Sequence, residues 1–106
     1  MNFAHMMKQA QQVQSRIGAV QEQLANTDFT GTAGGGAVSI TLSGKGTAKA
    51  VKLDKSVVVA EDSEMLEDLI LAAINDAGAK KEAATAEAMK GAMGGLNLPP
   101  GLSLPF

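Results

Sequence analysis

The order of hydrophobic patterns along this chain predicts an α/β fold of the α+β type: a helix, a small antiparallel β-sheet of two or three strands, a long second helix and an extended tail. Apolar residues first recur at helical spacing, then alternate with polar residues in two short segments next to glycines, and then recur at helical spacing again. The chain has 106 residues, enough for one small domain. We therefore expect a single domain over residues 1–93 and a separate tail over residues 94–106.

The first helix is predicted by apolar residues whose spacing alternates between three and four positions. They are Phe3, Met6, Ala10, Val13, Ile17, Val20 and Leu24. This is the a/d pattern of three heptads, and the other positions are mostly polar. Such a helix can pack on its own sheet or on a second copy of itself, and the narrow stripe favours a helical partner for part of its length. We call these seven residues the seam and expect them to form a dimer interface.

Two alternating segments after this helix predict a β-hairpin. Apolar residues occupy every second position in both, at Val38, Ile40, Leu42, Val51 and Leu53. A turn centred on residues 44 and 45 would pair Val38 with Val51, which keeps the two apolar faces together. A short edge strand is expected around Phe29.

A second helix is predicted to begin at Asp62 or Ser63. Acidic residues occupy its first turns, where negative charge is favourable, and an apolar stripe runs from Met65 to Ala77. Gly78 interrupts this stripe, and residues 79–90 are good helix formers without large apolar side chains. We expect this second half to project into solvent as an arm.

The composition gives no support to catalytic or metal chemistry. The chain has no cysteine and one histidine, His5, which excludes disulfides, thiolate catalysis and zinc-finger sites. The three glycines at 34–36 precede a predicted strand, whereas a dinucleotide-binding motif precedes a helix, and the segment 43–47 lacks the spacing of a P-loop. We expect no enzyme activity, cofactor, metal or small-molecule substrate. No apolar run approaches the roughly 20 residues that span a bilayer, so we expect a cytoplasmic protein without membrane association.

Charge is distributed unevenly within a net charge of −2. Residues 1–55 carry six basic and three acidic side chains, whereas residues 56–106 carry three basic and eight acidic ones. Such a polarised surface can bind an anion on one side. The absence of Trp and Tyr and the presence of one arginine argue against base stacking and base readout. Duplex DNA held through its phosphates is the nucleic-acid interpretation that remains, and a dimeric protein-interaction scaffold is the alternative.

The C-terminal segment combines three prolines with large apolar residues: Leu96, Leu98, Leu102, Leu104 and Phe106. The prolines exclude a helix, and disordered tails normally carry few large apolar residues. We expect either an extended strip that packs on the domain or on a partner subunit, or a flexible tail.

This segment, GGLNLPPGLSLPF over residues 94–106, closely resembles the C-terminus of the YbaB/EbfC family of bacterial nucleoid-associated proteins. So do MLEDLILAAINDA over residues 65–77, MMKQAQ over residues 6–11, and the glycine-rich entry to the hairpin. The resemblance implies an intertwined homodimer shaped like tweezers, with projecting helical arms. It also implies a protein of the nucleoid that binds duplex DNA and alters its conformation or packing, which can affect gene expression.

The resemblance gives the first choice of DNA contacts, and the position of the other basic residues in the predicted helices ranks the rest. Lys80 and Lys81 match basic positions on the corresponding family helix and are the first choice. Lys8 and Arg16, on the exposed side of the first helix, are the second choice, and Lys90 is the third. The acidic residues that flank the two adjacent lysines, and dilute their positive field, are Asp76, Glu82 and Glu87.

Overall fold

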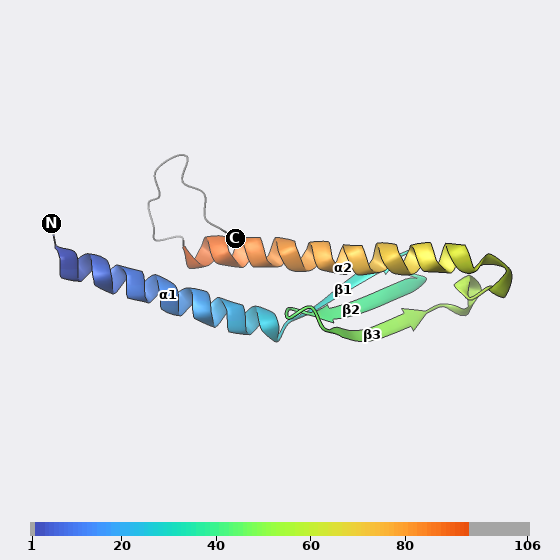
Figure 1. Cartoon of the computed structure of the whole chain (residues 1–106), viewed down its shortest axis with the longest axis horizontal. Coiled ribbons are helices and arrows are strands. Elements are labelled where there is room, and N and C mark those ends of the chain that lie inside the picture. Colours follow the sequence, from blue (N-terminus) through green and yellow to red (C-terminus); the bar gives the residue numbers. More distant parts are fainter. Residues whose placement is uncertain (1, 94–106) are drawn as a thin grey trace, which may run out of the picture.

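The computed structural model describes residues 2–93 of a chain whose extents are 71 × 27 × 16 Å. Helix α1 (Phe3–Ala25) is followed by strands β1 (Asp28–Ala33), β2 (Val38–Ser43) and β3 (Ala48–Leu53), and helix α2 (Ser63–Ala92) comes last. The 3-10 helices η1 (Lys55–Val57) and η2 (Ala60–Asp62) join β3 to α2. The strands form one antiparallel sheet in the order β1-β2-β3 (Figure 1). The predicted α+β order is confirmed, and the predicted tail strip lies outside the described residues.

Side chains at both ends of α1 satisfy backbone groups that a helix leaves unpaired. The Asn2 side chain accepts a hydrogen bond from the His5 N–H at 3.2 Å, as an N-cap does. At the other end, the Thr27 hydroxyl donates to the Gln23 carbonyl at 2.7 Å, and the Asn26 amide donates to the Glu22 carbonyl at 3.1 Å. The first helix is therefore confirmed, and it ends at Ala25, one residue after the last seam residue, Leu24.

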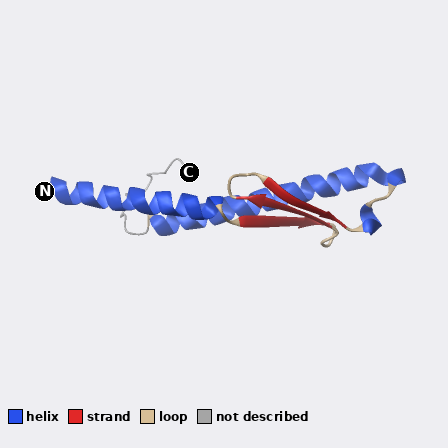
Figure 2. Ribbon diagram, turned by 90° about the horizontal axis from the view of Figure 1, so that it is seen from below, coloured by secondary structure: helices blue, strands red, loops and turns tan. Residues whose placement is uncertain are grey.

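The core is small because α2 lies directly on the sheet. Helix α2 packs along β1 and β2 on one face of the three strands (Figure 2). Val38, Ile40 and Ala73 form the buried cluster. A Cβ at Gly31 would collide with the backbone of Ala73 and Ala77, so only glycine allows this approach of helix and strand.

The strand register differs from the expected one. Val38 pairs with Leu53, and Ile40 pairs with Val51. The turn is closed by the Ser43 hydroxyl, which accepts from the N–H of Lys45 and of Thr47, and an irregularity next to Leu42 shifts the ladder. The shift at Val38 is an even number of residues, so the apolar faces of β2 and β3 still match.

Gly78 does not break α2, which runs unbroken for 30 residues. Its second half projects beyond the sheet, as expected for an arm, but it runs beside α1 rather than alone (Figure 1). Met89 and Ala92 are buried there. The arm therefore has a packing partner that the alanine-rich sequence of residues 79–90 did not suggest.

Candidate nucleic-acid interface

Lys8 and Arg16 lie on one exposed face of α1. They line a shallow hollow of about 480 Å³ together with Gln11, Gln12 and Ser15. Arg16 follows Lys8 by eight positions, which corresponds to about 12 Å along a helix axis. No residue that lines this hollow is acidic. The structure therefore brings together the two residues that ranked second from the sequence.

The Lys80 ammonium is already bound within the protein. It lies 3.2 Å from a carboxylate oxygen of Asp76 and donates a hydrogen bond to the Thr30 carbonyl at 3.0 Å. The same carboxylate oxygen accepts from the Thr32 N–H at 2.9 Å. Both contacts lower the pKa of Asp76, and the hydrogen bond from the Thr32 N–H has the larger effect. The cluster ties α2 to β1 and partly compensates the charge of Lys80.

Lys81 is directed to a different side of α2. Its ammonium lies beside Gly46 in the turn between β2 and β3, and its stem lines a hollow with Thr85 and Met89. Successive residues of a helix are about 100° apart, so Lys80 and Lys81 cannot face the same way. The two lysines that ranked first therefore do not form one patch on a single chain.

The other lysines are separate from these groups. Lys90 lies exposed in the last turn of α2, where a positive charge also favours the helix. On the sheet, Lys49 forms an ion pair with Asp28 at 3.0 Å. Within residues 2–93, no carboxylate lies within salt-bridge distance of Lys8, Arg16, Lys81 or Lys90.

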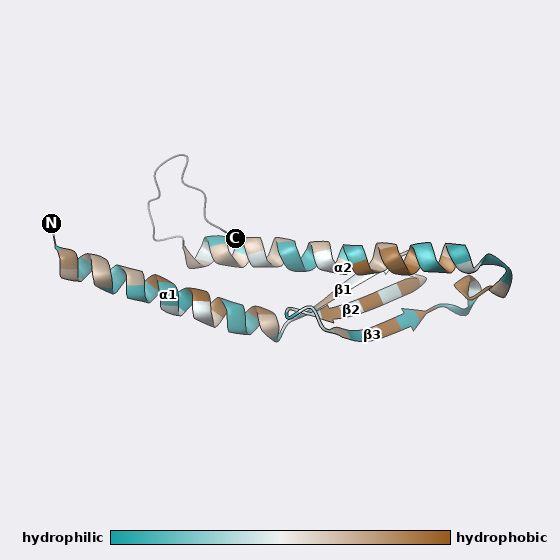
Figure 3. Cartoon of the chain, viewed as in Figure 1, coloured by the Kyte–Doolittle hydropathy of each residue, from teal (hydrophilic) through white to brown (hydrophobic). Residues whose placement is uncertain are grey.

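The seam of α1 is incompletely covered. No residue of α1 is buried, and Phe3 is 74% exposed. The later seam residues, from Val13 to Leu24, are half-buried where α1 runs beside α2. Figure 3 shows hydrophobic residues recurring along α1 between hydrophilic ones. The seam therefore has apolar surface to offer, and its role as a dimer interface stays a prediction.

A second exposed apolar surface was missed by the sequence interpretation. Val51 and Leu53 lie on the same face of the sheet as Val38 and Ile40, but on β3, which α2 does not cover, and they are 57% and 40% exposed. Ile74 of α2 is also exposed. A helix about 10 Å wide covers about two strands spaced 4.8 Å apart. The sequence predicted up to three strands and one helix to cover them, so an uncovered strand could have been expected.

The described part of the chain also bears on metals and membranes. Residues 2–93 contain no cluster of three or more His, Cys, Asp or Glu residues arranged to hold a metal ion. Neither helix in this range is long and apolar enough to cross a membrane.

The sequence matches the YbaB/EbfC DNA-binding family over residues 1–96. The chain belongs to this family. Among its YbaB/EbfC relatives, a nucleoid-associated protein of Rhodospirillum centenum is 57% identical over 105 residues, which cover 99% of this chain and 98% of that protein. A nucleoid-associated protein of Brucella anthropi is 52% identical over 101 residues, which cover 95% and 94% of the two chains. A crystal structure of an uncharacterized Helicobacter pylori protein has the same fold, with a TM-score of 0.66 and 24% identity, and the match covers 82% of this chain and 91% of that one.

These similarities confirm two predictions and leave two open. The YbaB/EbfC assignment and the DNA-binding, nucleoid-associated function are confirmed by the family and by the names of the relatives. The Helicobacter pylori structure supports the fold alone. The individual DNA contacts and the dimer interface stay predictions.

Proposed function

We propose that this YbaB/EbfC family member is a non-enzymatic homodimer that binds duplex DNA mainly through the phosphates and alters DNA conformation or packing at the nucleoid. The observation that carries the proposal is the polar face of α1. Lys8 and Arg16 border two glutamines and a serine there, without an acidic neighbour in the hollow. Ammonium, guanidinium, amide and hydroxyl groups all donate to phosphate oxygens.

The spacing of the two cations suits a duplex. About 12 Å separates Lys8 and Arg16 along the helix axis, and the major groove of B-DNA is about 12 Å wide. The two side chains can therefore contact phosphates of the two strands that border a groove. Because the chain has one arginine and no Trp or Tyr, we expect little discrimination between base sequences.

Two exposed apolar surfaces support a homodimer. One is the seam, and the other is formed by Val51 and Leu53 of β3. A soluble monomer rarely leaves such surfaces uncovered, and the small core of this chain would gain from a partner. A dimer would also present two copies of the α1 polar face, as well as two copies of Lys80, Lys81 and Lys90.

A protein-interaction scaffold is the second candidate. It is favoured by the net charge of −2 and by the Asp76 carboxylate, which occupies the Lys80 ammonium. Both features weaken attraction to a polyanion. The scaffold and the DNA-binding dimer share the apolar surfaces, so only a DNA measurement separates them.

The test is a fluorescence-anisotropy titration of unrelated DNA duplexes at several salt concentrations. We expect binding that weakens as salt rises, because each neutralised phosphate releases condensed counterions. The double variant Lys8→Gln/Arg16→Gln should flatten the slope of log K against log salt by about 1.8 per chain, if each residue makes one contact. Its affinity for all duplexes should fall by similar factors.

The control variant is Lys52→Gln/Lys55→Gln, which removes the same charge from two exposed residues outside the α1 hollow. An equal loss in the control would place the interface elsewhere than on α1. A dimer in sedimentation equilibrium that binds no duplex at low salt would support the scaffold.

A further inference from the structure

An apolar groove lies between α1, the second half of α2 and the turn between β2 and β3. We call it the arm groove. It encloses about 320 Å³ and is lined by Gln21, Leu24, Gly44, Lys81, Thr85 and Met89. A neighbouring hollow of about 360 Å³, lined also by Glu82 and Ala86, widens it around α2. The groove therefore follows the arm for more than two turns of α2.

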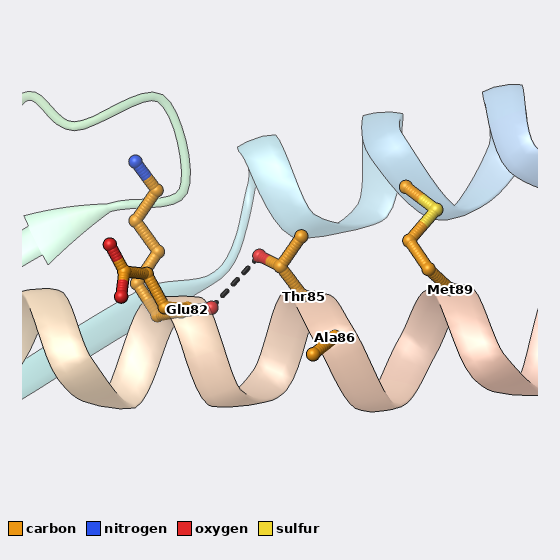
Figure 4. Close-up of a pocket in the computed structure, with 5 residues that line it drawn as sticks. Glu82, Thr85, Ala86 and Met89 are labelled. Atoms are coloured by element: carbon orange, nitrogen blue, oxygen red, sulfur yellow. Dashed lines mark hydrogen bonds between the residues drawn. The ribbon is translucent and has the colours of Figure 1, made fainter. Parts of the chain in front are cut away.

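The walls of the arm groove are apolar although several lining residues are polar. The Thr85 hydroxyl donates to the Lys81 carbonyl at 2.8 Å, so its one donor is used within α2 (Figure 4). Figure 4 also shows Met89 pointing toward α1. The stem of Lys81 adds methylene groups, since long charged side chains place their stems on apolar surface. Such a groove suits an apolar segment rather than a charged ligand.

We propose that the C-terminal segment, residues 94–106, folds back and packs in the arm groove of its own chain. The segment follows Met93, one turn of α2 beyond Met89. It starts with Gly94 and Gly95, and glycines after a helix end favour a reversal of the chain. The groove reaches Met89, so it is an apolar surface within range of the returning segment.

The spacing of apolar residues in the segment would give an extended chain one apolar side that can face the groove. Its large apolar residues all have even numbers: Leu96, Leu98, Leu102, Leu104 and Phe106. Alternate residues of an extended chain face the same side, so these five form one apolar strip. The three prolines exclude a helix and favour an extended backbone.

The length of the segment is sufficient. The path from Met93 back to Lys81 is about 18 Å along α2, and an extended chain covers that distance in about six residues at roughly 3.3 Å each. Leu96 to Leu102 can therefore span the groove, and the last four residues reach the turn at Gly44. Addition to the edge of β3 is a poorer alternative, because the prolines cannot donate to a strand ladder.

Packing in the arm groove would stabilise the association of α1 with α2. The segment would contact both helices and so limit their relative motion. This effect does not depend on DNA, and it can be measured on the free protein.

The chain has no cysteine, so a single nitroxide label can be placed at Ser103→Cys, between the apolar positions of the strip. In the full-length ¹⁵N-labelled protein, we expect paramagnetic broadening of the amide signals of Thr85, Ala86 and Met89. The additional substitution Ala86→Glu places a charge in the groove and should abolish the broadening. The matched control is Ala83→Glu, which alters an exposed residue of the same helix outside the groove and should leave the broadening intact.

A mixed sample tests whether the segment binds its own chain. Spin-labelled chains without ¹⁵N are refolded together with unlabelled ¹⁵N chains, and broadening should be weak or absent on the groove signals. Clear broadening of the groove signals in this mixed sample, where the label and the ¹⁵N are on different chains, would overturn the proposal in favour of docking on a partner subunit. It would equally be overturned by broadening confined to Val51 and Leu53, or by no broadening at all.

Discussion

Replacing Lys81 with Ala should weaken DNA binding more than replacing Lys80 with Ala, although the two lysines are adjacent. Lys80 already contacts the Asp76 carboxylate at 3.2 Å and the Thr30 carbonyl at 3.0 Å. No carboxylate of residues 2–93 lies within salt-bridge distance of Lys81. A cation whose charge is compensated within the protein contributes less to the field at a phosphate.

The size of the effect follows from counterion release. One phosphate contact contributes about 0.9 to the slope of log K against log salt. Lys81→Ala should therefore flatten the slope by about 0.9 per chain, and Lys80→Ala by less. When salt rises from 50 to 200 mM, a variant that has lost one contact should lose about 3.5-fold less affinity than the wild type. A homodimer that has lost both copies of the contact should lose about 12-fold less.

The assay is fluorescence anisotropy with one labelled duplex at four or more salt concentrations. Both single variants are measured beside the wild-type protein, and circular dichroism with sedimentation equilibrium checks that fold and assembly are unchanged. Equal flattening by the two variants would refute the reasoning, because ion pairing would then not distinguish the lysines. A larger effect of Lys80→Ala in an intact fold would refute it as well.

Four further outcomes are expected from the structure. The hydrogen bond from the Thr32 N–H, and to a smaller extent the one from Lys80, lower the pKa of Asp76 in the folded protein. The ionised Asp76 therefore stabilises the fold above the ordinary aspartate pKa of about 3.9, and this stabilisation is lost as the pH falls through the lowered folded-state pKa. Urea unfolding in a pH series should therefore show less acid destabilisation for Asp76→Asn than for wild type. Ile17→Asp should weaken both the dimer and the fold, since it places a charge in the half-buried seam, and an unchanged mass in sedimentation equilibrium would remove the seam from the interface. Gly31→Ala should cost about 1–3 kcal/mol or more in thermal unfolding because its Cβ meets the backbone of α2, whereas Gly18→Ala, in open space on α1, should stabilise by up to about 1 kcal/mol. Deletion of residues 95–106 should lower the melting temperature, and an unchanged melting curve would favour a flexible tail.

Local patterns in the sequence were sufficient for the order and type of the elements. The heptad spacing from Phe3 to Leu24 corresponds to α1, and the alternation around Val38 and Ile40 corresponds to β2. Both signals depend on residues a few positions apart, which is the range over which helices and strands repeat. The family assignment was also available from short motifs of the sequence, chiefly those of residues 65–77 and 94–106, and the match over residues 1–96 confirms it.

The tertiary structure alone decided which patterned residues are covered and which charged groups are paired. Val51 and Leu53 continue the apolar face of Val38 and Ile40, yet they are exposed because α2 covers only β1 and β2. Lys80 and Lys81 are adjacent in the chain, yet one meets β1 and the other meets the turn between β2 and β3. Burial and ion pairing depend on the element that lies alongside a residue, and that element is brought there by residues tens of positions away, beyond the range of any local pattern.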